Sequence, residues 1–185
     1  MNIQDLGSLG EFIGAVAVVV LGVLLAWSPV IADNERDRTV ATDAQDAPRD
    51  VLATLEGRWE GEGVLLERQA TFAMTWEKAL NGRFLRLEFS NSFADVDPPQ
   101  PVLESQAYYL LGGSTLTGQW MDSRGVILAL RAEIAGSALV AYWTGEESGR
   151  TEYRVVDPDA IEVTDSVWAE GEYHVFATAR YRRIR

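Results

Sequence analysis

The sequence predicts an all-β fold, an antiparallel up-and-down barrel of about ten strands, preceded by one N-terminal transmembrane helix. The first observation is that apolar and polar residues alternate with a period of two over most of the chain after Gly57. The second is that Gly, Asn, Asp and Pro interrupt this alternation about every 8 to 12 residues, as in strands joined by hairpin turns. A meander of this length either closes or leaves two exposed edges, and closure removes both.

The N-terminal stretch 12–32 reads FIGAVAVVVLGVLLAWSPVIA and carries no charge. It has about the length of a membrane-spanning helix, roughly 20 residues. We expect residues 1–32 to form a permanent single-pass membrane anchor. The residues before the span carry Asp5 and Glu11 but no Lys or Arg, whereas a signal peptide begins with positive charge. The alternative is a signal peptide that is cut near Ala32, which would release an exported, periplasmic domain.

The segment 33–52 is polar and charged and lacks an apolar period, so it is predicted to be a linker. A short helical turn is expected at 51–55, where the linker enters the barrel domain. That domain is predicted to span residues 53–185.

The strands of the barrel are expected in the order in which the alternation occurs along the chain. The clearest signal is a hairpin over 71–93, joined at Asn81-Gly82, a pair favoured in tight hairpin turns. The three prolines of the following segment, 94–101, exclude a strand there. Gly61 and Gly63, in the strand before the hairpin, permit a strong bend or a close approach of another backbone. The other strands are expected at 58–66, 102–111, 116–122, 126–134, 138–144, 150–156, 161–168 and 172–183.

The alternation also predicts which face of each strand lies inside the barrel. The opposite register would bury charged side chains such as Arg86, Glu88 and Arg131 at a large desolvation cost. The predicted inward set is therefore the apolar one: Phe72, Met74, Trp76, Leu85, Leu87, Phe89, Ala107, Tyr109, Leu111, Gly118, Trp120, Val126, Leu128, Leu130, Leu139, Ala141, Trp143, Tyr153, Val155, Ile161, Val163, Val167, Val175, Ala177, Ala179 and Tyr181.

Several short motifs resemble those of a known group of barrels. The tripeptide Gly57-Arg58-Trp59 resembles the G-x-W of lipocalins and their calycin relatives, in which the Trp closes one barrel end and an Arg of the last strand lies over it. This resemblance implies that Trp59 closes the barrel, with Arg180, Arg182 or Arg183 as its partner, and we take Arg182. Over nearly the whole barrel domain, the motifs LEGRWEGEG, WEKALNGRFLRLEF, QWMDSRG and YRR look like those of a bacterial lipocalin-like family of unknown function.

A more distant resemblance is to the nitrobindin type of ten-stranded barrel, which holds haem through a His on its final strand. The matching position falls near Thr178 here, whereas the only imidazole is that of His174. The predicted register directs His174 outward, and a single His does not make a zinc site, which needs three or four ligands. We therefore expect no haem and no other cofactor, with His174 as the only, weak, metal-ligand candidate.

The composition disfavours several classes of function. The net charge of −12 argues against nucleic-acid binding, which needs clustered Lys and Arg. The chain has no Cys, which excludes thiolate chemistry and disulfides. It contains neither the G-x-S-x-G motif of serine hydrolases nor a phosphate-binding loop, so we expect no enzymatic activity.

The candidate binding site is the aromatic lining of the barrel interior. Asp122 follows Trp120 on the same face and would lie at the mouth of the interior, where it could accept a hydrogen bond from a ligand. The alternative is that Asp122 caps the turn over residues 123–125 through its own side chain. The ring-bearing residues of this candidate site are Trp76, Tyr109, Trp120, Trp143 and Tyr153.

Three functions remain open at this point. The leading one is a membrane-tethered barrel that binds a small, mostly apolar molecule, since inward Trp and Tyr give a pocket apolar walls with polar tips. The second is a structural or interaction module whose interior is filled by its own side chains. The third is a haem protein of the nitrobindin type.

Overall fold

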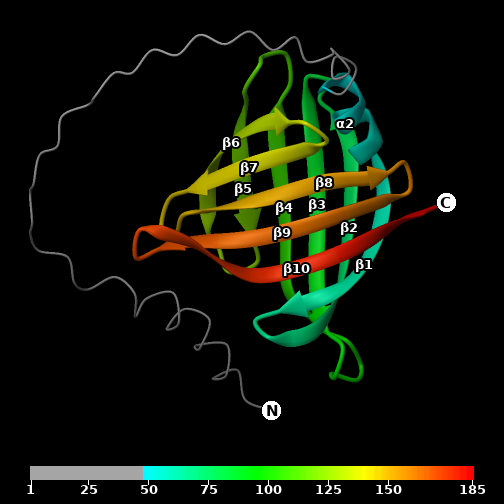
Figure 1. Cartoon of the computed structure of the whole chain (residues 1–185), viewed down its shortest axis with the longest axis vertical. Coiled ribbons are helices and arrows are strands. Elements are labelled where there is room, and N and C mark those ends of the chain that lie inside the picture. The colour runs from blue at the N-terminus through cyan, green and yellow to red at the C-terminus, as the bar shows by residue number, and fades with distance from the viewer. Residues whose placement is uncertain (1–47) are drawn as a thin grey trace, which may run out of the picture. The chain divides into compact units, whose positions relative to one another are not determined.

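The computed structural model describes residues 48–185, which form a closed barrel of ten antiparallel strands with one short helix, α2 (Figure 1). Each strand pairs with its neighbours along the chain, and the first pairs with the last. The predicted all-β closed barrel is thereby confirmed. The elements are α2 (Pro48–Leu55), β1 (Gly57–Leu65), β2 (Arg68–Ala79), β3 (Phe84–Phe93), β4 (Pro101–Leu110), β5 (Leu116–Asp122), β6 (Ile127–Ala135), β7 (Ala138–Thr144), β8 (Gly149–Asp157), β9 (Ala160–Ala169) and β10 (Glu172–Ile184).

The predicted N-terminal helix and most of the predicted linker lie outside the described residues. Within residues 48–185, no helix is both long enough and apolar enough to cross a membrane.

Helix α2 begins at Pro48, a residue whose fixed φ suits the first turn of a helix. Val51 and Leu55, four positions apart, lie on one helix face and are both buried in the barrel core. The helix ends where Gly57 takes a φ of 131°. The expected helical turn is therefore present, but it crosses the predicted boundary between residues 52 and 53, because its buried face belongs to the core.

The predicted hairpin consists of β2 and β3. Met74 lies opposite Phe89 and Trp76 lies opposite Leu87, as inward-facing pairs. The connecting turn contains Asn81 and Gly82, both with positive φ. It is longer than the two residues of a minimal hairpin, because β2 ends at Ala79 and β3 begins at Phe84.

Closure depends on a close approach between β1 and β10. A side chain at Gly63 would place its Cβ 2.0 Å from the Thr178 carbonyl oxygen, and one at Gly61 would meet the Tyr181 ring at 2.8 Å. These two glycines therefore let the last strand pair along the whole of β1, as the sequence suggested.

The prediction for β10 is wrong at two neighbouring positions, Val175 and His174. Val175 was expected to face inward, but 61% of its surface is exposed. The pairing with β9 shifts between Val175 and Ala177, so Phe176 is an extra residue in a β-bulge. Because the bulge reverses the alternation, Phe176 packs against the core and Val175 faces solvent.

The barrel interior has two halves that differ in burial. In the helix half, next to α2, most of the large inward side chains are completely buried, and Leu111, Ile134 and Val155 are partly buried. In the distal half, several inward side chains remain partly exposed. The helix half includes Trp59, Trp76, Leu85, Tyr109, Leu139, Ile161 and Tyr181. The partly exposed residues of the distal half include Phe89, Trp120, Trp143, Asp165 and Val167.

Candidate functional site

Three of the predicted site residues form one aromatic cluster in the helix half. The ring of Trp76 stacks on Tyr109 at a centroid distance of 5.7 Å and meets Tyr153 edge-on at 5.1 Å. All three side chains are buried. The indole Nε1 of Trp76 donates to the sulfur of Met74 at 3.3 Å. This cluster packs within its half of the barrel, with the phenols as its polar tips.

The two other predicted aromatic residues, Trp120 on β5 and Trp143 on β7, lie in the distal half and are only half-buried. Trp120 packs against Phe89 at a centroid distance of 6.0 Å. The Trp143 ring crosses Gly149 of the neighbouring strand β8, where a Cβ would meet it at 2.3 Å. The absence of a side chain at Gly149 thus allows the indole to lie flat along the wall.

A carboxyl group lies on the same inner surface, and the sequence analysis missed it. Asp165 of β9 falls on the face shared by Ile161, Val163 and Val167. Its backbone pairs with Thr151 on β8 and with Ala177 on β10, both of which are buried. The alternation alone points Asp165 inward. It was left out because the inward set was assumed to be apolar.

The surroundings of Asp165 change its titration. Burial raises the pKa of this carboxyl to about 6, although a hydrogen bond from Thr151 opposes the shift. The Thr151 hydroxyl donates to Oδ1 at 2.6 Å. Burial, and to a smaller extent the nearby charge of Asp165, also raise the pKa of Tyr109, Tyr153 and Tyr181. Asp165 therefore lies in an interior of neutral phenols and aromatic rings.

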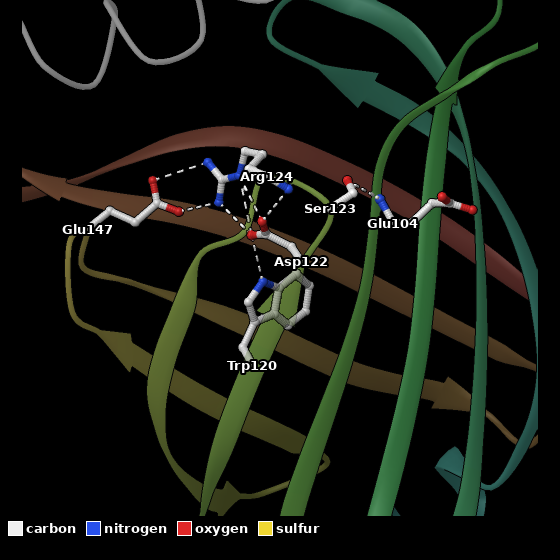
Figure 2. Close-up of polar contacts among 6 residues, drawn as sticks. All are labelled: Glu104, Trp120, Asp122, Ser123, Arg124 and Glu147. Atoms are coloured by element: carbon white, nitrogen blue, oxygen red, sulfur yellow. Dashed lines mark hydrogen bonds and ion pairs between the residues drawn. The ribbon is translucent and has the colours of Figure 1, made fainter.

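Asp122, predicted at the mouth of the interior, is held by its own chain (Figure 2). Its side chain is completely buried and accepts hydrogen bonds from Trp120 Nε1 at 3.1 Å and from the Arg124 backbone N–H at 2.9 Å. The Arg124 guanidinium bridges Asp122 at 2.7 Å to Glu147 at 2.5 Å. Burial alone would raise the pKa of Asp122, but the bonds from Arg124 and Trp120 lower it. This is the turn-capping arrangement, and the bridge also joins the β5–β6 and β7–β8 turns.

The arginine that lies over Trp59 is Arg183 and not the predicted Arg182. Trp59 is buried and donates from Nε1 to the Leu55 carbonyl at 2.8 Å. The guanidinium over its ring, at 4.2 Å, belongs to Arg183, which lies directly opposite in the β1–β10 pairing. Arg182 is exposed on the outer face. Strand alternation could have predicted Arg183 as the partner of Trp59, because Tyr181 points inward and the next residue on that face is Arg183.

His174 is exposed, and the prediction that it points outward is wrong: the bulge that turns Val175 outward places His174 on the same sheet face as Val167, its partner in the β9–β10 pairing. Its Nε2 lies 3.2 Å from the Ala169 carbonyl oxygen and 3.7 Å from Glu172. Residues 48–185 contain no group of three or more potential ligands arranged to hold a metal ion.

A separate pocket of about 280 Å³ lies beside α2. Lys78 and Glu56, two of its lining residues, form an ion pair at 3.0 Å. None of the predicted site residues lines it, but the core residues Leu85 and Leu116 do, so the pocket lies at the α2 end of the barrel core and not in the distal half. The remaining lining residues are Leu52, Ala53, Leu111, Gly112 and Gly113.

Comparison with known proteins supports the fold but does not assign this chain to a family. No protein-family model matches the chain, and no curated protein sequence matches it. Among solved structures, the chain is similar to the S-type phycobiliprotein lyase CPES from Guillardia theta, with a TM-score of 0.53 and 8% sequence identity. The match covers 74% of this chain and 92% of the lyase. At that identity the likeness concerns the barrel fold, and the resemblances to the uncharacterised bacterial family and to nitrobindins stay predictions.

Proposed function

We propose that this protein binds a small, mostly apolar molecule in the distal half of its barrel. The observation that carries the proposal is the contrast between the two halves. The large aromatic side chains next to α2 are buried by one another, whereas Trp120, Trp143 and Val167 face inward and still keep accessible surface. Aromatic walls with few polar groups are typical of small-molecule sites.

The structural neighbour gives this proposal limited support. A phycobiliprotein lyase uses a barrel of similar architecture, so the fold is compatible with a small-molecule partner. We propose binding without catalysis for this chain, because Asp122 is bound to Arg124 and His174 is exposed, with Nε2 against the Ala169 carbonyl oxygen.

The test is a titration of the full-length protein with N-phenyl-1-naphthylamine, a neutral apolar probe that fluoresces when it leaves water. We expect saturable binding of one probe per chain. Val167→Trp should fill the distal half and abolish binding. Val175→Trp adds the same ring on the outer face and should bind like the wild type.

Two results would overturn the proposal. One is the absence of saturable binding, which would favour a structural module with a filled interior. The other is unchanged binding by Val167→Trp, which would place the site elsewhere, such as the pocket beside α2.

We also propose, from the sequence alone, that residues 12–32 tether the protein to a membrane. The full chain should then stay in the membrane fraction after alkaline carbonate extraction, whereas a chain that begins at residue 46 should be released. Recovery of a mature chain that begins after Ala32 would instead establish the cleaved signal peptide.

A further inference from the structure

We infer that the molecule bound in the distal half carries a protonated nitrogen, which Asp165 holds through a charge-assisted hydrogen bond. This inference rests on the proposed function and specifies its ligand as an apolar amine. It starts from an acidic group that the fold places inside the barrel, where buried charges are normally paired.

The carboxyl of Asp165 is oriented but not neutralised. Thr151 Oγ1 donates to Oδ1 at 2.6 Å, which fixes the plane of the group. Among residues 48–185, Asp165 takes part in no ion pair within 4.0 Å. One hydrogen bond to a neutral hydroxyl leaves most of the acceptor capacity of a carboxylate available.

No group that faces Asp165 from the surrounding strands forms an ion pair with it. His174 of β10 lies on the same face as Val167, but its Nε2 contacts the Ala169 carbonyl oxygen and Glu172 instead. Strand β8 contributes Thr151 and Tyr153, β4 contributes Tyr109, and β10 contributes Tyr181. Each of these carries a neutral hydroxyl at physiological pH. The interior near Asp165 is therefore polar enough to accept a polar group from a ligand, and it has a net negative charge.

The basic residues of the neighbouring strand β8 point to the outer surface, away from Asp165. The guanidinium of Arg150 lies over the ring of Tyr173 at 4.4 Å, and Arg154 pairs with Glu152 on the outer surface. Strand alternation keeps both outside as long as Thr151 and Tyr153 face inward. Because residues 48–185 place no cationic group within 4.0 Å of Asp165, we assign its cation to the bound molecule.

The position of Asp165 fits this role. It is half-buried, in the half of the barrel that keeps accessible surface, and Val167 is the next residue on the same face. The face of an aromatic ring also attracts cations. A ligand whose apolar body packs against Trp143 and Val167 would leave its amino group free to reach the carboxyl.

The experiment uses three probes of nearly the same shape on the full-length protein: 9-(aminomethyl)anthracene, 9-anthracenemethanol and 9-anthracenecarboxylate. The wild type should bind the amine at least about tenfold tighter than the alcohol, and the carboxylate most weakly, as expected for a charge-assisted bond. Asp165→Asn should remove the preference for the amine and leave the affinity for the alcohol within about twofold. Glu162→Gln, which removes an exposed carboxyl from the outer face of the same strand, should change neither affinity.

The outcomes separate this inference from the proposed function. If the wild type binds the alcohol but binds the amine no more tightly than the alcohol, the inference of an amine ligand fails and the proposed interior site stands. The same holds if Asp165→Asn keeps the preference for the amine. If the neutral probes do not bind at all, the proposed function fails and the inference fails with it. The order of the three affinities is measured on the wild type, so this part of the test does not depend on whether a variant folds.

Discussion

At the scale of single residues, Asp165 lowers the stability of the barrel at neutral pH. Its pKa is about 6 in the fold, against an ordinary value of 3.8, because burial disfavours the charged form. The folded state therefore holds this proton more tightly than the unfolded chain does. The difference corresponds to about 3 kcal/mol of lost stability at pH 7, because one pKa unit is worth about 1.4 kcal/mol.

Asp165→Asn should therefore increase the free energy of unfolding at pH 7, by up to about 3 kcal/mol. An amide has no charge to bury and can still accept the Thr151 hydroxyl. The gain should shrink as the pH falls below about 6 and vanish well below 3.8, where the wild-type carboxyl is protonated in both states. Urea unfolding of both proteins at a series of pH values measures this. A loss of stability at every pH would show that the carboxylate is stabilised by a contact the variant lacks.

At the scale of elements, α2 is held on the barrel by the last strand. Arg183 donates to the Thr54 and Glu56 carbonyls at the end of the helix, at 2.6 Å each, and to the Pro158 carbonyl at 3.1 Å. The carbonyls at a helix C-terminus have no intrahelical partners and attract a cation. The guanidinium also covers Trp59, so one side chain joins α2, β1, β10 and the β8–β9 turn.

Arg183→Gln should lower the free energy of unfolding by about 2 to 3 kcal/mol, because several hydrogen bonds from a charged donor are lost and the carbonyls are left without partners. Arg182→Gln, at the neighbouring exposed position, is the matched control and should change it by less than about 0.5 kcal/mol. Chemical unfolding followed by Trp fluorescence measures both. Equal losses in the two variants would contradict the assignment of the closing role to Arg183.

The bridge between the β5–β6 and β7–β8 turns is the second link between elements. The pair of Arg124 and Glu147 is largely buried, with side-chain exposures of 32% and 13%. Glu147→Gln should cost about 1 kcal/mol and speed amide exchange in residues 145–148, because the bridge is lost while Arg124 stays on Asp122. Asp95→Asn breaks a similar but exposed pair with Arg68 and should have almost no effect. Protection of the turn amides that does not change in Glu147→Gln would rule out this link.

At the scale of the whole molecule, closure removes the edges of the sheet. The β1–β10 pairing joins the two ends of the barrel chain, and α2 covers one end of the interior. Every strand therefore has two partners, so none presents an unpaired edge for aggregation. The burial of Val51 and Leu55 makes α2 part of the same folding unit as the barrel.

Two truncations test the extent of this unit. A chain that starts at residue 46 should unfold in one cooperative transition and keep the near-ultraviolet circular dichroism of the full protein. A chain that starts at residue 57 should lose several kcal/mol, because it lacks two buried apolar side chains and uncovers Trp59. Similar stability of the two truncated chains would show that α2 is not part of the core.

Much of the fold could be predicted from the sequence, because strand periodicity is a local property. Alternation around Phe72, Met74 and Trp76 indicated both the strand and its inner face, and turn residues set the number of strands. The wrong predictions arise where the alternation of apolar and polar residues is interrupted, or where every inward residue was assumed to be apolar. The bulge at Phe176 reverses the faces of Val175 and its neighbours, and nothing in the local sequence marks the extra residue.

By itself, the sequence determined that this protein is a closed antiparallel barrel with an aromatic interior, because hairpin spacing and a period of two leave few other ways to bury one face of every strand. Only the tertiary structure decided which residues act together. The β1–β10 register put Arg183 opposite Trp59, and the β5–β6 turn bound Asp122 to Arg124. The pairing of β8 with β9 set Asp165 beside Thr151 within the barrel. These partners are distant in sequence or depend on a turn's geometry, so their meeting depends on how the barrel closes.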